Sequence, residues 1–189
     1  MGISIGIDLG TTNSAVAYID QHGLPQMVKN DCGEPTTPSA VYFKGEGDII
    51  VGQEAKEALA FEPDRVAMFF KRNMGSTSFS PQYLGRLYDA TSLSREVLAY
   101  LMNAAVAQLG EVGEVIVTVP AYFHNPQREA TIAAGKAAGL NIIRTINEPT
   151  AAAVAYSQRH PDITGRFLVY DLGGGTFDVS ILDLGAGLF

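Results

Sequence analysis

The sequence has little cysteine, no excess of positive charge and no metal-binding histidine pattern, and each shortage excludes a class of protein. One cysteine, Cys32, cannot form an internal disulfide, and the three histidines show neither metal-ligand spacing nor cysteine partners. There are 13 Lys and Arg against 20 Asp and Glu, which gives a formal net charge of −7. Binding to a nucleic-acid backbone needs clustered Lys and Arg, so we expect no nucleic-acid partner.

Signals for a membrane or for export are missing as well. No apolar run approaches the roughly 18 residues that a membrane-spanning helix requires. Residues 1–6 contain no basic stretch followed by an apolar one, as a signal peptide would. Gly6 also stands where a myristoylation signal needs Ser or Thr. We therefore expect a soluble cytoplasmic protein without a membrane partner.

The two common nucleotide-binding fingerprints fail. A Walker A loop requires a glycine five residues before Gly135 and Ser or Thr after Lys136, but Ala130 and Ala137 stand there. Gly173 and Gly175 are followed by a strand pattern rather than by a helix, which excludes the dinucleotide-binding turn.

What the sequence does contain is a pattern of strands and helices typical of an α/β protein. Residues 3–8 and 14–19 predict a hairpin, and 115–119 predict a buried central strand. We place helix starts after Gly52, at Ser94 and at Asn125-Pro126, and another near Glu148. The second half then reads β-α-β-α-β-β, a mixed sheet flanked by helices. The remaining expectations are an inner helix face with Ala55, Ala58 and Leu59, irregular structure over 73–89, a strand at 142–146, and a buried strand at 167–170 paired with 178–182.

An internal repeat changes the interpretation. Residues 6–13, Gly-Ile-Asp-Leu-Gly-Thr-Thr-Asn, align without gaps on residues 169–176, Val-Tyr-Asp-Leu-Gly-Gly-Gly-Thr. Small residues let successive backbone amides converge on an anion, and Thr and Asn add side-chain donors. Because Asp8 and Asp171 would repel a bare phosphate, a divalent cation is implied, with Mg²⁺ the best fit. The alternative is a pair of ordinary tight turns, which two aligned copies disfavour.

The sequence resembles the seventy-kilodalton heat-shock chaperones of the DnaK type over nearly its whole length. The two loops alone would fit any member of the actin and sugar-kinase superfamily. Val-Pro-Ala-Tyr-Phe at 119–123 and Asn-Glu-Pro-Thr-Ala-Ala-Ala at 147–153 are specific to the chaperones. Further matching segments are 5–14, 36–39, 70–72, 127–128 and 171–179.

The resemblance implies an actin-like ATPase of the ribonuclease H-like fold that uses ATP or ADP with Mg²⁺. Asp8 and Asp171 would then hold the metal through its waters, and Lys71 would be the catalytic lysine that stabilises the transferred phosphoryl group. Without the resemblance, Lys71 would be taken for a solvated surface lysine. The residues implied in phosphate contact are Gly10, Thr11, Thr12, Asn13, Gly173, Gly174 and Gly175.

Four further roles follow from the same resemblance. Glu148 and Thr176 would join Lys71 and Asp171 in the catalytic centre, and Pro120 and Arg128 would couple the nucleotide site to a substrate domain. Glu148 could otherwise be a first-turn residue favoured by the helix dipole. Pro120 and Arg128 could be a strand-ending proline and an exposed helical arginine.

The resemblance also divides the chain. Residues 1–165 would form lobe I, with a shortened upper subdomain at about 38–90, and 166–189 the first hairpin of lobe II. The segment between Lys71 and Ser94 is about twenty residues shorter than usual in the family, which resembles the bacterial HscC branch. We expect the rest of lobe II and the peptide-binding domain to be absent from this sequence, and the 189-residue chain by itself to be inactive.

The implied function is control of unfolded-polypeptide binding by ATP hydrolysis, with a J-domain cochaperone and a nucleotide exchange factor as further partners. Two alternatives from the same superfamily remain. A small-molecule kinase would need a carboxylate base toward a sugar hydroxyl, which the Asn-Glu-Pro-Thr-Ala-Ala segment disfavours. An actin-like filament protein would need polymerisation surfaces that the sequence does not identify.

Overall fold

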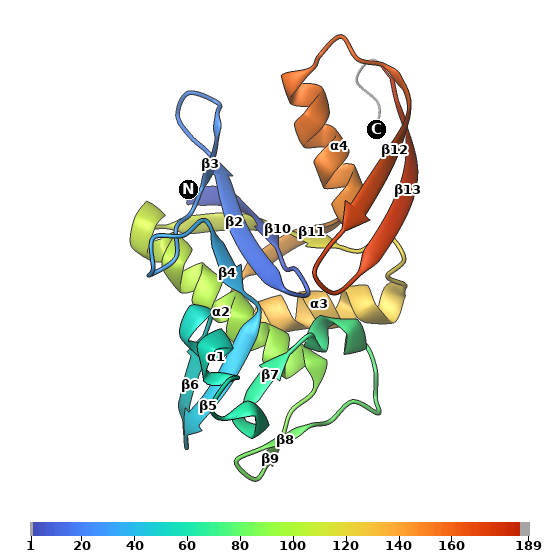
Figure 1. Cartoon of the computed structure of the whole chain (residues 1–189). Coiled ribbons are helices and arrows are strands. Elements are labelled where there is room, and N and C mark those ends of the chain that lie inside the picture. The colour runs from blue at the N-terminus through green and yellow to red at the C-terminus, as the bar shows by residue number, and fades with distance from the viewer. Residues whose placement is uncertain (1, 186–189) are drawn as a thin grey trace.

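The structure, a computed structural model that describes residues 2–185, is built on a mixed central sheet (Figure 1). β1 (Ile3–Asp8) and β2 (Asn13–Ile19) form the expected antiparallel hairpin. β10 (Val112–Val119) runs parallel to β1, and β11 (Asn141–Asn147) runs parallel to β10. The strand order is β11-β10-β1-β2-β3, with β4 pairing to β2 beside this path. The predicted α/β class with a mixed sheet is confirmed. The short strands are β3 (Pro25–Met27) and β4 (Thr36–Pro38).

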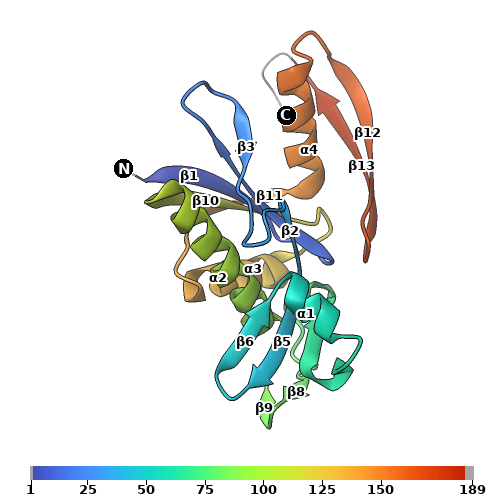
Figure 2. The same ribbon diagram turned by 60° about the vertical axis from the view of Figure 1, so that its left-hand side comes forward.

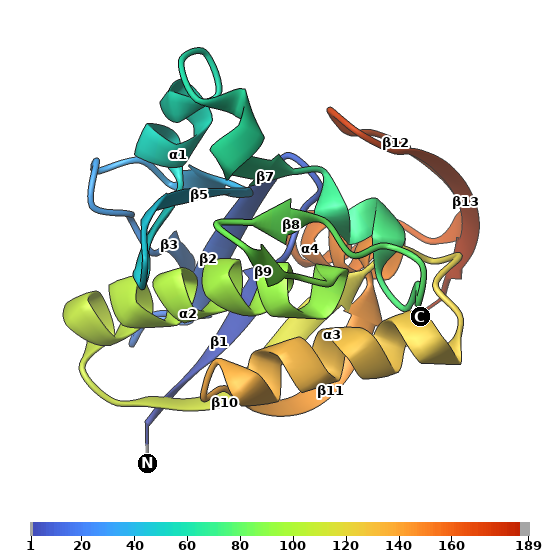
Figure 3. The same cartoon turned by 90° about the horizontal axis from the view of Figure 1, so that it is seen from below.

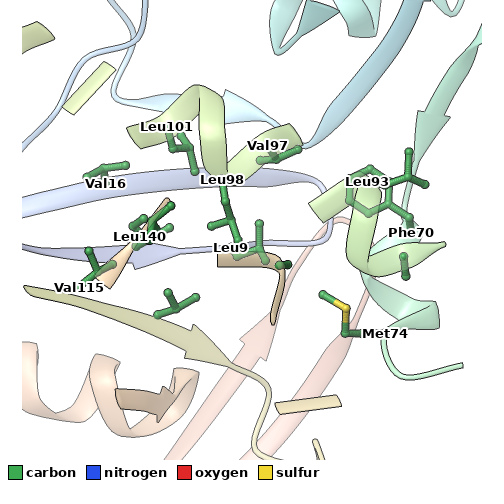
Figure 4. Packing of buried hydrophobic residues seen from close by; sticks show 14 of the residues in the cluster. Leu9, Val16, Phe70, Met74, Leu93, Val97, Leu98, Leu101, Val115 and Leu140 are labelled. Carbon is green, nitrogen blue, oxygen red and sulfur yellow. The ribbon is translucent and has the colours of Figure 1, made fainter. Parts of the chain in front are cut away.

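One face of this sheet is covered by two helices, α2 (Ala90–Leu109) and α3 (Asn125–Ala137), which lie side by side in Figure 3. Apolar side chains recur on α2 every three or four positions, so they form one stripe toward the sheet. Figure 4 shows Leu98 pointing from α2 to Leu9. The buried side chains of this layer include Ile5, Ile7, Leu93, Val97, Leu98, Leu101, Ala105, Val115, Val117, Val119 and Ala134.

The opposite face of the sheet is only partly covered. α4 (Glu148–Arg159) stands on that side in Figure 2, at the carboxyl ends of β10 and β11. Ile116 points to this face and keeps 37% of its surface exposed. The expectation that residues 115–119 are buried throughout is therefore wrong for Ile116, because strand neighbours point to opposite faces and one helix does not span the sheet.

A second, smaller layer lies below the central sheet in Figure 1. β6 (Asp48–Val51), β5 (Ala40–Gly45) and β7 (Val66–Met68) form a three-stranded sheet in that order, with α1 (Gln53–Ala58) packed against it. Ala55 is buried in this layer as expected, whereas Leu59 is exposed because α1 ends before it. The segment 73–89, expected to be irregular, contains a small hairpin. The other elements are the 3-10 helices η1 (Pro63–Arg65) and η2 (Phe70–Asn73), and the strands β8 (Gln82–Tyr83) and β9 (Arg86–Leu87).

The last two strands form a separate two-stranded sheet beside α4. β12 (Gly165–Leu172) and β13 (Phe177–Leu184) pair antiparallel along their whole length, as predicted. Tyr170 is 62% exposed, however, so the prediction of a buried strand at 167–170 is wrong. The hairpin packs one face toward α4, and its other face is open within the described residues. The end of the predicted hairpin, residues 186–189, lies outside the described residues.

Two helix starts differ from the sequence expectation. α2 begins after Asp89, whose carboxylate accepts from the Ser92 N–H at 2.7 Å while the Ser92 hydroxyl accepts from the Asp89 N–H, a reciprocal cap. Ser94, the predicted cap, is buried inside the helix. The N-cap position of α3 is His124, one residue before the predicted Asn125, and its backbone N–H donates to the Gln127 Oε1 at 3.1 Å. Among the described helices, none combines the length and the apolar character that crossing a membrane requires.

We predict that Leu98→Ala lowers the free energy of unfolding by about 2–5 kcal/mol, because it leaves a cavity between α2 and the sheet. Val106 lies on the same helix with 43% of its surface exposed, so Val106→Ala is the matched control and should change stability by less than about 0.5 kcal/mol. Urea denaturation followed by circular dichroism measures both. Equal losses in the two variants would show that the stripe on α2 is misassigned.

Candidate functional site

Two loops with matching sequences face each other across a cleft. The turn between β1 and β2 and the turn between β12 and β13 lie next to each other in Figures 1 and 2. The cleft between them has a volume of about 540 Å³. Its lining includes every residue that the sequence suggested for phosphate, metal or catalysis: Asp8, Gly10, Thr11, Thr12, Asn13, Lys71, Glu148, Asp171, Gly173, Gly174, Gly175 and Thr176.

The loops approach so closely that only glycine fits at the contact. A Cβ atom on Gly174 would stand 2.6 Å from the Thr12 Oγ1, and one on Gly175 would stand 2.5 Å from the Thr11 Cγ2. Both distances are far below a normal van der Waals contact. The small residues of the second loop are therefore required by its packing against the first loop.

The first loop is held by two serines. The Gly10 N–H donates to the Ser14 Oγ at 3.2 Å, and the Ser39 hydroxyl donates to the Gly10 carbonyl oxygen at 2.8 Å. The Ser39 N–H donates to the Thr12 carbonyl at 2.8 Å, and the two serine hydroxyls lie 2.9 Å apart. Ser39 follows β4, so pairing of β4 with β2 brings it to the loop. Sequence reasoning listed residues 36–39 as matching but gave Ser39 no role.

One polar atom in this loop is buried without a partner. The Thr12 Oγ1 has no hydrogen-bond partner among the described residues. A buried hydroxyl without a partner is unfavourable by roughly 1–3 kcal/mol. The same hydroxyl is a ready donor to an anionic oxygen in the cleft, so it fits a phosphate ligand.

The carboxylates Asp8 and Asp171 stand at corresponding places in the two hairpins, at the end of β1 and near the end of β12. The Thr118 hydroxyl donates to the Asp8 Oδ1 at 2.7 Å, because β10 runs parallel to β1 and brings Thr118 alongside. Sequence reasoning missed Thr118, although it lies two residues before Pro120 in a segment it had singled out. The described residues contain no group of three or more His, Cys, Asp or Glu side chains that could hold a metal directly.

A buried ion pair closes the floor of the cleft. Lys71, in η2, is only 5% exposed, and its Nζ donates to the Glu148 Oε1 at 2.6 Å. The pKa of the Glu148 carboxyl lies above its ordinary value, mainly because the group is buried. Lys71 lowers this pKa, and the negative charges of Asp8 and Asp171 raise it. Burial and the charge of Asp171 likewise raise the pKa of the nearby Asp178 carboxyl. Lys71 thus offers positive charge where several carboxylates meet.

Pro120 and Arg128 are not among the described residues that line the cleft. Pro120 is buried at the end of β10. Arg128, in α3, donates from Nε to the Phe123 carbonyl oxygen at 2.9 Å and from Nη2 to the Asn147 Oδ1 at 2.6 Å. Asn147 directly precedes Glu148, so Arg128 contacts the junction from which the buried carboxylate emerges.

These features together can bind a polyphosphate with a cation. Residues of two small-residue loops, including Thr11, Thr12 and Asn13, line the cleft from two sides, and such loops can offer donors to an anion. Asp8 and Asp171 line the same cleft, and the described residues add no third carboxylate, histidine or cysteine that would complete a metal cage around them. Such an arrangement suits an ion that keeps several waters, as Mg²⁺ does.

Comparison with known families agrees with this geometry. The model of the family described as "Hsp70 protein" matches residues 4–82 and 76–189, which covers nearly the whole chain. Members of this family are chaperones whose nucleotide-binding domain has an actin-like ATPase fold and takes ATP or ADP with Mg²⁺. The chain belongs to the Hsp70 family.

Proposed function

We propose that this chain is the phosphate-binding lobe of a chaperone ATPase whose hydrolysis of ATP controls capture and release of unfolded polypeptides. The observation that carries the proposal is the convergence of two Asp-Leu-Gly loops on one cleft with the buried Lys71 at its floor. A kinase or filament protein of the same superfamily could share the loops. The family match over both chaperone-specific segments, 119–123 and 147–153, favours the chaperone.

In this proposal the two loops hold the phosphates from opposite sides. Thr11, Thr12 and Asn13 would donate to phosphate oxygens from the first loop, and the amides of Gly174 and Gly175 would donate from the second, while Gly173 would shape the loop through its own hydrogen bond. The buried Thr12 hydroxyl without a partner supports this assignment. Thr176 closes the second loop, since its carbonyl oxygen accepts from the Gly173 N–H at 2.9 Å.

Asp8 and Asp171 would hold Mg²⁺ through its water ligands. The ion supplies neutralisation of phosphate charge when bound. Thr118 orients Asp8 by donating to one of its oxygens and leaves the other oxygen available to the cleft.

Lys71 and Glu148 would form the catalytic pair. Phosphoryl transfer depends mainly on positioning and on stabilisation of charge in the transition state. Lys71 is fixed by its ion pair and by burial, so its ammonium group need not reorganise when charge develops on the transferred group. Glu148 would orient Lys71 through the ion pair, which also anchors the start of α4 to η2.

The domain division belongs to the same proposal. Residues 1–165 would be lobe I and residues from 166 onward the first hairpin of lobe II, with 38–90 as a shortened upper subdomain. The small size of the β5–β9 region supports the relation to the HscC branch. Unfolded clients, a J-domain cochaperone, a nucleotide exchange factor and a cytoplasmic location complete the proposal.

Replacement of Lys71 tests the proposal most directly. Lys71→Ala in the full-length protein should lower the single-turnover hydrolysis rate by roughly 10²–10³, since one preorganised charge is lost. ATP affinity should stay within about tenfold, because the two loops remain. The control is Lys44→Ala, which removes an exposed lysine from the same subdomain. A rate within about threefold of the unchanged protein would refute the assignment of Lys71.

Removal of the metal tests the role given to Asp8 and Asp171. Two carboxylates that face a triphosphate repel it unless a cation lies between them. Calorimetric titration of ATP with Mg²⁺ and with excess chelator should therefore give much weaker binding in chelator. Equal affinity in the two conditions would contradict a metal-mediated role.

Arg128→Ala tests coupling. Arg128 contacts Asn147 outside the cleft, so the change should reduce ATP-driven release of a bound peptide more than it changes basal hydrolysis. Fluorescence release and steady-state hydrolysis assays on the full-length protein compare the two effects. If hydrolysis fell more than release, Arg128 would belong to the catalytic centre itself.

A further inference from the structure

The short helix η2 carries a second cation beside Lys71, and none of the roles above uses it. Arg72 directly follows Lys71 and is exposed. Its Nη2 donates a hydrogen bond to the carbonyl oxygen of Gly175, in the turn between β12 and β13. The guanidinium carbon lies 5.4 Å from the centre of the Phe69 ring, a distance at which the ring attracts the cation and restricts its orientation.

Phe69 occupies the N-cap position of η2. Its φ is 59°, in the left-handed region that a bulky residue adopts only at a free-energy cost, and such residues occur often at functional sites. After this turn the two consecutive cations reach different elements. Lys71 contacts Glu148 at the start of α4, and Arg72 contacts Gly175 in the second loop. The short helix η2 thus contacts both α4 and the second loop.

Gly175 is also a point where the two loops meet. A Cβ atom there would stand 2.5 Å from the Thr11 Cγ2 and 3.1 Å from the Arg72 Nη2. The hydrogen bond from Arg72 therefore holds the second loop at Gly175, the residue that contacts Thr11 of the first loop. The hairpin that carries this loop is otherwise packed chiefly on α4, which lies behind it.

We propose that Arg72 is a positioning residue that holds the second loop, residues 173–176, against the first and so sets the width of the phosphate-binding gap. The inference rests on the proposed function and extends it, because the ligand is the nucleotide's polyphosphate. Arg72 acts on that ligand through Gly175 and not by direct contact. Lys71 and Arg72 then divide two tasks between neighbouring positions.

The different roles of Lys71 and Arg72 predict different kinetic effects when each is removed. A loop held in place presents its amides to the phosphates equally in the ground state and in the transition state, which is uniform binding. Loss of such an interaction raises KM and leaves kcat nearly unchanged. Loss of Lys71 should do the reverse, since its charge is needed most in the transition state.

Hydrogen–deuterium exchange of the nucleotide-free, full-length protein tests the contact without relying on catalysis. In Arg72→Ala, amides over residues 172–178 should exchange about three- to tenfold faster, as expected for loss of one hydrogen bond. This segment includes the Gly173 N–H, which donates to the Thr176 carbonyl oxygen. The matched control is Arg86→Ala, which removes an exposed arginine paired with Glu46 at 3.3 Å in the same subdomain. It should leave the segment unchanged.

Steady-state kinetics supply the second readout. Arg72→Ala should raise KM for ATP by about three- to tenfold with kcat within about twofold, and Arg72→Lys should recover part of the loss because an ammonium group can also donate to a carbonyl.

Two results would overturn the inference: unchanged exchange at 172–178, or an equal rise over β1 and β10, since the contact is local. If the protein bound no ATP, the proposed function would fail. The exchange experiment would still decide whether Arg72 holds the loop.

Discussion

The buried ion pair between Lys71 and Glu148 is the contact on which the arrangement of the cleft depends. Lys71 is 5% exposed and its Nζ donates to the Glu148 Oε1 at 2.6 Å, and a charge buried without its partner is unfavourable. The pair joins η2, which follows the small three-stranded layer, to the first residue of α4 on the far side of the central sheet. The pair therefore fixes η2 relative to the start of α4, and the contact of Arg72 with Gly175 adds a second polar link across the same side of the cleft.

The two faces of the central sheet differ, because one is packed with apolar side chains and the other carries polar groups of the site. The face toward α2 and α3 is filled with aliphatic side chains and supplies most of the stability. The other face carries Asp8 and Thr118 at its carboxyl-terminal edge, next to the start of α4. Because successive residues of a strand point to opposite faces, β1 and β10 each contribute to the core and to the site at once. Rigid strands thus place the polar groups, while the glycine-rich turns let the backbone approach a ligand.

The contacts of Arg128 and Arg72 extend the site outward in two directions. Arg128 reaches Asn147, which directly precedes Glu148, so a displacement of α3 would be transmitted to the ion pair through one covalent neighbour. Arg72 reaches the Gly175 carbonyl and so connects η2 to the second loop. Both arginines act on backbone or amide groups and not on the cleft's carboxylates. These contacts suit a role in positioning the backbone around the cleft rather than in supplying charge to the reaction.

The sequence by itself determined the hairpin at residues 3–19 and the pairing of β12 with β13, because these depend on local periodicity and turn chemistry. The internal repeat also identified the two loops before their positions were known. Tertiary structure decided the rest. The exposure of Ile116 and Tyr170 and the role of Ser39 depend on which segments pack together, which local patterns do not encode. The cap by Asp89 is different, because its partner Ser92 is only three residues away. The cleft itself joins residues more than 160 positions apart, and only folding brings Thr12 against Gly174 and places Thr118 beside Asp8.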